Sequence, residues 1–178
     1  KGEVDEPHGT INTIIIINKE LTHGAMVRSL ITASEAKAAA LQELAVNSRY
    51  SCGLATGTGT DQVGIASRLT GEIPLTGAGK HTKLGELIGL TVKNSIKETL
   101  ALQDSLTPQS QRSAKVHLER FGIDKESMIE KICSFLDEEE SKLLQKNFAT
   151  INNDSVAVAA ASALVHLRDK IEWGILPE

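Results

Sequence analysis

The hydrophobic residues of this chain follow a strand pattern in parts of the first 70 positions and a helical spacing in most of the remainder. Residues 10–18 hold four consecutive isoleucines, from Ile14 to Ile17. Consecutive β-branched residues favour a strand. A strand without a polar face is expected to be covered on both sides, as a central strand is. Residues 62–67 alternate between apolar and polar or small positions, and residues 52–56 form a further short apolar run, so both are predicted strands.

Apolar residues recur three or four apart over residues 22–44 and 83–102, which predicts two amphipathic helices. Thr22 and Thr82 stand at their starts, where a hydroxyl can cap the first free N–H groups. Helical periodicity continues to the end of the chain. The last of these segments is apolar almost all round and is expected to be buried. The remaining predicted helices lie near residues 109–121, 125–136, 138–146 and 154–173.

These elements predict an α+β fold, with a small mixed sheet flanked by helices and a helical C-terminal part. We expect residues 1–105 to form an α/β core that carries the active site. Residues 106–178 are expected to form a helical part packed on the same domain. The chain begins at Lys1 without a methionine and enters a strand almost at once, so we expect native N-terminal sequence to be missing.

Composition limits the classes of function. Apolar residues make up 40% of the 178 positions and aromatic residues only 3%, so the core must be built from aliphatic side chains. A net charge of −4, without clustered basic residues, argues against nucleic acid as the main partner. No apolar run is long enough to span a membrane. Cys52 and Cys133 follow no metal or redox spacing, which fits a reducing cytoplasm.

The first candidate for chemistry is the loop at residues 55–62, Ala-Thr-Gly-Thr-Gly-Thr-Asp-Gln. Gly57 and Gly59 allow a close approach to a ligand, because glycine has no side chain to obstruct it. Thr58 and Thr60 supply hydroxyls, and Asp61 can accept or transfer a proton. The alternative is a tight turn whose polar side chains have no functional role.

The second candidate is the glycine-rich entry to a helix at residues 77–86. His81 can act as an acid or base near neutral pH, and Glu86 adds a carboxylate in the first turn. Thr82 and the free N–H groups of the helix start offer an anion or oxyanion site. The segment lacks the glycine and hydroxyl spacing of a phosphate-binding loop. His81 can also be an ordinary polar loop residue.

Three further polar residues stand where apolar ones would be expected or where a site could use them. Asn12 lies near the start of a core strand, and a strand-end role bonded to local backbone is the alternative to ligand binding. Lys37 falls on the apolar stripe of a helix, where it either extends along the core to solvent or projects into a site. Glu35 is two residues away and points in a different direction, so it can be a solvated surface residue.

Four stretches occur in the order seen in one family: residues 6–14, 32–41, 55–61 and 77–87. The chain resembles the CbiZ family, the adenosylcobinamide amidohydrolases, most clearly over residues 2–96. The resemblance implies hydrolysis of adenosylcobinamide to adenosylcobyric acid and aminopropanol, or its phosphate, in cobamide salvage. It implies a corrinoid as substrate and no required cofactor. It also implies further sequence before the strand at residues 10–18 in other members.

On this interpretation the two polar segments face each other across one cleft. Asp61 or His81 is the base toward a water or toward the hydroxyl of Thr58 or Thr60, and Glu86 is a further catalytic candidate. The substrate-binding candidates are His8, Asn12, Glu35, Lys37, Gly57, Gly59 and Thr82. Zinc held by His8, His81 and Asp61 has no supporting ligand spacing, so we expect no metal site. The alternative function is a corrinoid-binding or sensing module without catalysis, and a third is an unrelated hydrolase. A homo-oligomer is compatible with the sequence.

Overall fold

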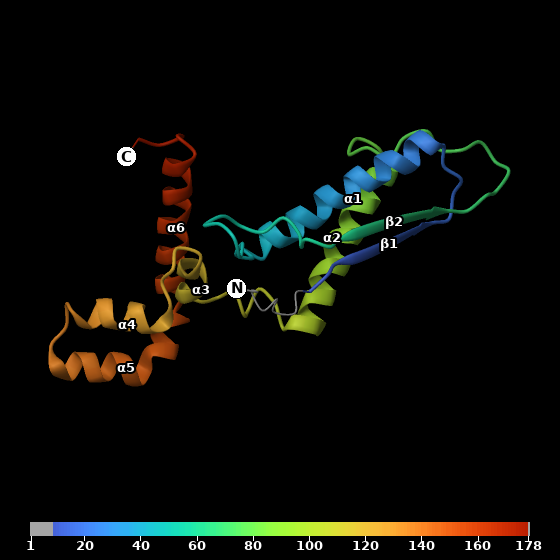
Figure 1. The fold of residues 1–178 in the computed structure, drawn as a ribbon. Coiled ribbons are helices and arrows are strands. Elements are labelled where there is room, and N and C mark those ends of the chain that lie inside the picture. The colour runs from blue at the N-terminus through green and yellow to red at the C-terminus, as the bar shows by residue number, and fades with distance from the viewer. Residues whose placement is uncertain (1–8, 178) are drawn as a thin grey trace, which may run out of the picture. The chain divides into compact units, whose positions relative to one another are not determined.

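The computed structural model describes residues 9–177, and the chain divides into two compact units (Figure 1). The first unit comprises Lys1–Leu44 and Ala55–Ser105. The second comprises Ala45–Leu54 and Leu106–Glu178. The segment between the first helix and the Gly/Thr loop therefore belongs with the C-terminal helices.

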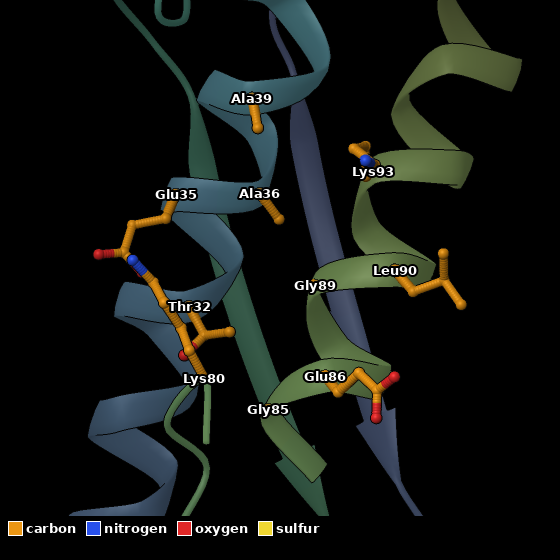
Figure 2. Close-up of a pocket in the computed structure, with 10 residues that line it drawn as sticks. All are labelled: Thr32, Glu35, Ala36, Ala39, Lys80, Gly85, Glu86, Gly89, Leu90 and Lys93. Atoms are coloured by element: carbon orange, nitrogen blue, oxygen red, sulfur yellow. The ribbon is translucent and has the colours of Figure 1, made fainter. Parts of the chain in front are cut away.

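The first unit is a strand–helix–strand–helix arrangement. Strand β1 spans Asn12–Ile17, helix α1 His23–Glu43, strand β2 Gln62–Ser67 and helix α2 Lys83–Asp104. The two strands pair in parallel, in a register that runs from Asn12↔Gln62 to Ile17↔Ser67. Both helices lie on one side of these strands, in front of them in Figure 2. The predicted α+β class with a helical C-terminal part is confirmed.

The core of this unit lies between the helices and one face of the sheet. Small residues on α1 allow α2 to approach closely, and alanines at positions 33, 36 and 40 are at most 8% exposed. Aliphatic side chains of α2 and β1 fill the space, as the low aromatic content requires. Both predicted caps are confirmed: the Thr22 hydroxyl accepts from the Ala25 N–H, and the Thr82 hydroxyl accepts from the Gly85 N–H. The largest aliphatic members of this core are Ile17, Leu21, Ile88, Val92 and Ile96.

Two expectations for the sheet are wrong. Residues 52–56 form no strand of the sheet, because Leu54 makes only an isolated antiparallel bridge with Asn47 in the second unit. The isoleucine strand is covered on one side only: Ile17 is buried, but Ile14 and Ile16 are 78% and 81% exposed. Alternate side chains of a strand point to opposite faces, and the helices cover only one of them.

The second unit holds four helices: α3 Ala114–Glu119, α4 Lys125–Cys133, α5 Glu138–Asn152 and α6 Ser155–Glu172. The acidic run at the start of α5 forms a capping box between Asp137 and Glu140. The expectation that the last helix is buried is wrong, since only Ala161 and Val165 of α6 are buried. Within residues 9–177, no helix taken singly is long and apolar enough to cross a membrane, whereas α5 and α6, bent by 77°, pass that test only as a pair.

Candidate active site

The side chain of Asp61 is the centre of a cluster that joins three segments of the first unit. Its Oδ1 accepts from the Ile11 N–H at 3.0 Å and from the Thr58 hydroxyl. Its Oδ2 accepts from the Thr58 N–H at 2.8 Å and from the ammonium group of Lys37. Each carboxylate oxygen therefore has two donors, and the cluster ties the loop to α1 and to the residue before β1.

Both charged members of this cluster are nearly buried, with side-chain exposures of 13% for Lys37 and 7% for Asp61. Burial raises the pKa of Asp61, but hydrogen bonds from Lys37, Thr58 and Ile11 outweigh it and hold that pKa below its usual range. Asp61 is therefore ionised at neutral pH. Lys37, which interrupts the apolar stripe of α1, points to this carboxylate rather than to solvent.

Gly57 lets the loop pass close to the buried pair. A Cβ atom built on Gly57 would lie 2.5 Å from Asp61 Oδ2 and 2.9 Å from Lys37 Nζ. Any larger side chain would push the carboxylate and the ammonium apart. The glycine at this position is thus required by the cluster itself.

The rest of the loop is exposed and carries free polar groups. The Thr60 hydroxyl pairs with the Thr10 hydroxyl, which holds the tip of the loop next to the start of β1. Among residues 9–177, the N–H groups of Gly57 and Gly59 donate to no protein acceptor. Acyl transfer requires a nucleophile beside a base and N–H donors that can bind an oxyanion. The loop offers both: the Thr58 hydroxyl bonded to Asp61, and the two N–H groups that face no protein acceptor.

The second predicted segment lies against the other flank of α1. Lys80 pairs with Glu35 at 3.1 Å, and the hydroxyl of Thr32 donates to the carbonyl of Ala78 at 2.9 Å. Glu35 and Lys37 are two positions apart, about 200° around the helix axis, so their side chains point to opposite flanks. Thr82 acts as the cap of α2, while His81 is exposed and has no hydrogen-bond partner among the described residues.

A groove of about 400 Å³ lies between α1 and α2 (Figure 2). Small residues on both helices leave this space, and Glu35 and Lys80 meet at one side of it. Glu86 extends away from α1 in the same view. The groove is lined by Thr32, Glu35, Ala36, Ala39, Lys80, Gly85, Glu86, Gly89, Leu90 and Lys93.

The structure therefore gathers the candidates into two groups instead of one cleft. Thr58, Thr60, Gly57, Gly59, Asp61 and Lys37 form the loop cluster on one flank of α1. Glu35 and Glu86 line the groove, and Thr82 lies at the start of its second helix. Asn12 is exposed at the first position of β1, opposite Gln62, which directly follows Asp61. His8 lies outside the described residues.

Several residues that build these two sites carried little signal in the sequence. Thr10 and the N–H of Ile11 complete the loop cluster from 50 positions away. Only the fold could reveal them. The sequence does contain a signal for the groove. Ala36 and Ala39 in one helix, and Gly85 and Gly89 in the other, are small residues at helical spacing, so each pair lies on one helix face. Within residues 9–177, no group of three or more acidic, histidine or cysteine side chains is placed to hold a metal ion.

The buried pair predicts a specific acid sensitivity. The pKa of Asp61 is lower in the folded state, so its stabilising contribution is complete above the unfolded value of about 3.9 and is lost as pH falls through the folded value. The difference in urea midpoint between the wild type and Asp61→Asn should therefore shrink as pH is lowered from 5 toward 2.5. A difference that stays constant over this range would show that the carboxylate charge is not what stabilises the cluster.

A hydroxyl bonded to a buried carboxylate, which an ammonium group orients in turn, has the general form of a nucleophile beside a base held by a third group. A family model described as adenosylcobinamide amidohydrolase, CbiZ, matches residues 2–108, and the chain belongs to this family. The chain is also 45% identical, over 102 residues, to the uncharacterized protein MJ1613 of Methanocaldococcus jannaschii. That alignment covers 57% of this chain and 39% of the relative. No solved structure matches the chain.

Proposed function

We propose that this chain hydrolyses the amide bond that joins aminopropanol to the corrinoid in adenosylcobinamide. The products are adenosylcobyric acid and aminopropanol, or its phosphate if the phosphorylated form is the substrate, and the acid can re-enter cobamide synthesis. The observation that carries the proposal is the Thr58–Asp61–Lys37 cluster in a member of an amidohydrolase family. The corrinoid is a substrate here, and the proposed chemistry uses only side chains and water.

The cluster suggests an order of events. The Thr58 oxygen attacks the amide carbon while its proton passes to Asp61 Oδ1, which already accepts that hydrogen bond. The carbon–nitrogen bond then breaks, and the same proton goes to the leaving amine. Water hydrolyses the resulting ester of Thr58, which yields the carboxylic acid and restores the hydroxyl. Because Lys37 favours the ionised carboxylate, the proton on Asp61 is short-lived and is handed on to the amine.

The remaining groups have supporting roles in this proposal. The N–H groups of Gly57 and Gly59 stabilise the oxyanion, which needs donors that no protein acceptor occupies. Asn12 lies at the same end of the sheet and can bind one of the many peripheral amides of a corrinoid. Lys37 orients Asp61 instead of contacting substrate.

The activity is tested by incubating the chain with adenosylcobinamide and following cobyric acid and aminopropanol by liquid chromatography and mass spectrometry. The proposal expects both products in equal amounts. A shift of the corrinoid absorption spectrum without products would instead identify a binding or sensing module. No spectral shift and no products would exclude a corrinoid ligand.

The groove between α1 and α2 is the alternative location of the active site. A substitution at Gly89 distinguishes this location from the loop cluster. A Cβ on Gly89 meets no atom within 4 Å, and Gly89 lines the groove, so Gly89→Leu introduces a side chain at this wall from an unobstructed position. If chemistry occurs at the loop cluster, this variant should keep its activity within about twofold, as surface substitutions usually do. Gly24→Leu, at another unobstructed helical glycine, is the matched control. A tenfold or greater loss in Gly89→Leu alone would move the site to the groove, which Glu35 and Glu86 line.

A further inference from the structure

Helix α6 of the second unit is apolar on its exposed side as well as on its packed side. It packs against α3 and α5, and its Ala161 and Val165 are buried there. On the opposite side, Val156 is 74% exposed and Leu164 is 65% exposed. At about 100° per residue, the exposed apolar residues fall within a sector about 100° wide. They form one strip, called here the α6 face: Val156, Ala160, Ala163, Leu164, Leu167 and Ile171.

The cations of α6 lie beside this face, and its acids lie on the packed side. Arg168 and Lys170 fall within about 40° of the two edges of the α6 face. Glu172 falls about 140° from the centre of the face. Asp169 pairs with Arg120 at 2.7 Å, and its side chain is only 14% exposed, so its charge is neutralised within the unit. The α6 face is therefore an apolar strip with positive charge along both edges.

An exposed tryptophan stands at the end of the helix. Trp173 directly follows α6 and is 62% exposed, and the ammonium group of Lys170 lies 5.2 Å from the centre of its ring. Tryptophan is enriched where a membrane meets water, because its ring is apolar and its N–H is polar. Basic side chains at such a boundary lay their carbon chains along the apolar surface and extend their charges to the headgroups. This combination is typical of a helix that lies in a membrane surface and does not span it.

We propose that the α6 face binds the surface of a lipid membrane that contains anionic headgroups. The apolar strip enters the outer part of the acyl chains, and Arg168 and Lys170 contact the phosphates. Charge favours this occupant over a second copy of the chain. The nearest charges at both edges are cations, and a second copy would supply no acid on the same face to pair with them, whereas anionic headgroups would. The inference is independent of the reaction proposed above, because the family match ends at residue 108 and α6 lies beyond it.

The fluorescence of Trp173 tests the proposal directly, because the sequence contains one tryptophan. The whole chain is mixed with vesicles of phosphatidylglycerol and phosphatidylcholine in equal parts, and with vesicles of phosphatidylcholine alone. With the anionic vesicles, the emission maximum should move by about 10 nm to shorter wavelength, and the chain should float with the lipid. Binding to phosphatidylcholine alone should be at least about tenfold weaker. No binding, or equal binding to both kinds of vesicle, would overturn the proposal.

Aspartate substitutions test the apolar strip. Leu164→Asp and Leu167→Asp should each weaken binding to the anionic vesicles at least about tenfold, and should shift Tm by less than about 2 °C because both side chains are exposed. Ile73→Asp is the matched control, since it adds the same charge at a 94% exposed position outside α6 and should bind within about twofold of the wild type. A Tm lowered by about 10 °C or more in the leucine variants, or a dimer that they break up, would overturn the proposal, because the face would then be covered by protein.

A pair of charge substitutions tests the edges of the face. Arg168→Gln combined with Lys170→Gln should weaken binding to the anionic vesicles by about tenfold or more, since each basic residue near the surface contributes to the attraction. Lys83→Gln combined with Lys142→Gln removes the same charge from side chains that are 76% and 71% exposed outside α6. This control should bind within about twofold of the wild type. An equal loss in both double variants would overturn the proposal, because net charge and not the α6 face would then govern binding.

Discussion

Thr58→Ala is expected to lower kcat for adenosylcobinamide hydrolysis by about 10³-fold or more, with KM changed little. The hydroxyl that donates to Asp61 is the proposed nucleophile. Among residues 9–177 its one other hydrogen bond is a long one of 3.4 Å, which it accepts from the Thr60 N–H. The Thr58 N–H still donates to Asp61 Oδ2 in the variant, so the loop keeps its anchor. Steady-state kinetics of the purified variant provide the measurement.

Two further variants make this expectation specific. Thr58→Ser keeps a hydroxyl at the same position and should recover activity to within about tenfold of the wild type. Thr56→Ala is the matched control, because Thr56 is exposed in the same loop and makes no side-chain hydrogen bond among the described residues. If Thr58→Ala kept the wild-type kcat, Thr58 would not be the nucleophile. Attack by a water molecule that Asp61 directs would then be the remaining mechanism.

Gly85→Ala is expected to be the most destabilising single-methyl change in the first unit. A Cβ on Gly85 would lie 2.5 Å from the carbonyl carbon of Gly79 and 2.8 Å from the carbonyl oxygen of Ala78. These are backbone atoms held by the Thr82 hydroxyl, which donates to the Gly79 carbonyl, and by the Thr32 hydroxyl on Ala78. The backbone must move, at a cost of about 3 kcal/mol, or roughly 10 °C in Tm.

Gly89→Ala supplies the matched comparison in the same helix. Its added methyl group meets no atom within 4 Å, so the variant should be more stable by about 0.5–1 kcal/mol through helix propensity alone. Thermal unfolding of the two variants is the measurement. If Gly85→Ala melted within about 2 °C of the wild type, the turn at residues 77–82 would be able to relax without disturbing α2.

Local sequence signals predicted most of the regular structure. Thr22 and Thr82 cap helices that begin at the next residue, because capping depends only on neighbours within three positions. The alternation at residues 62–67 predicted β2 correctly for the same reason. The predicted strand at residues 52–56 failed because pairing depends on a distant partner, and in the structure Leu54 meets only Asn47.

The candidate site could be predicted by residue type but not by arrangement. The loop composition singled out Thr58, Thr60 and Asp61. The charge of Lys37 on an apolar stripe left two alternatives open, solvent or a site, and in the structure the ammonium group bonds to Asp61. The sequence could not place His81 and Glu86 relative to the loop. Their position depends on which flank of α1 the segment before α2 contacts. Glu35 lies on that flank and pairs with Lys80, whereas Lys37 lies on the other flank and bonds to Asp61 of the loop.

The most direct test of the account is the reaction of this chain with adenosylcobinamide in ¹⁸O-labelled water, analysed by mass spectrometry. The account predicts free aminopropanol, or its phosphate, together with adenosylcobyric acid that carries one heavy oxygen in the new carboxylate. It also predicts that added hydroxylamine diverts part of the product to the hydroxamate, because an ester of Thr58 forms on the way. Recovery of intact adenosylcobinamide from the wild-type chain would contradict the proposed activity.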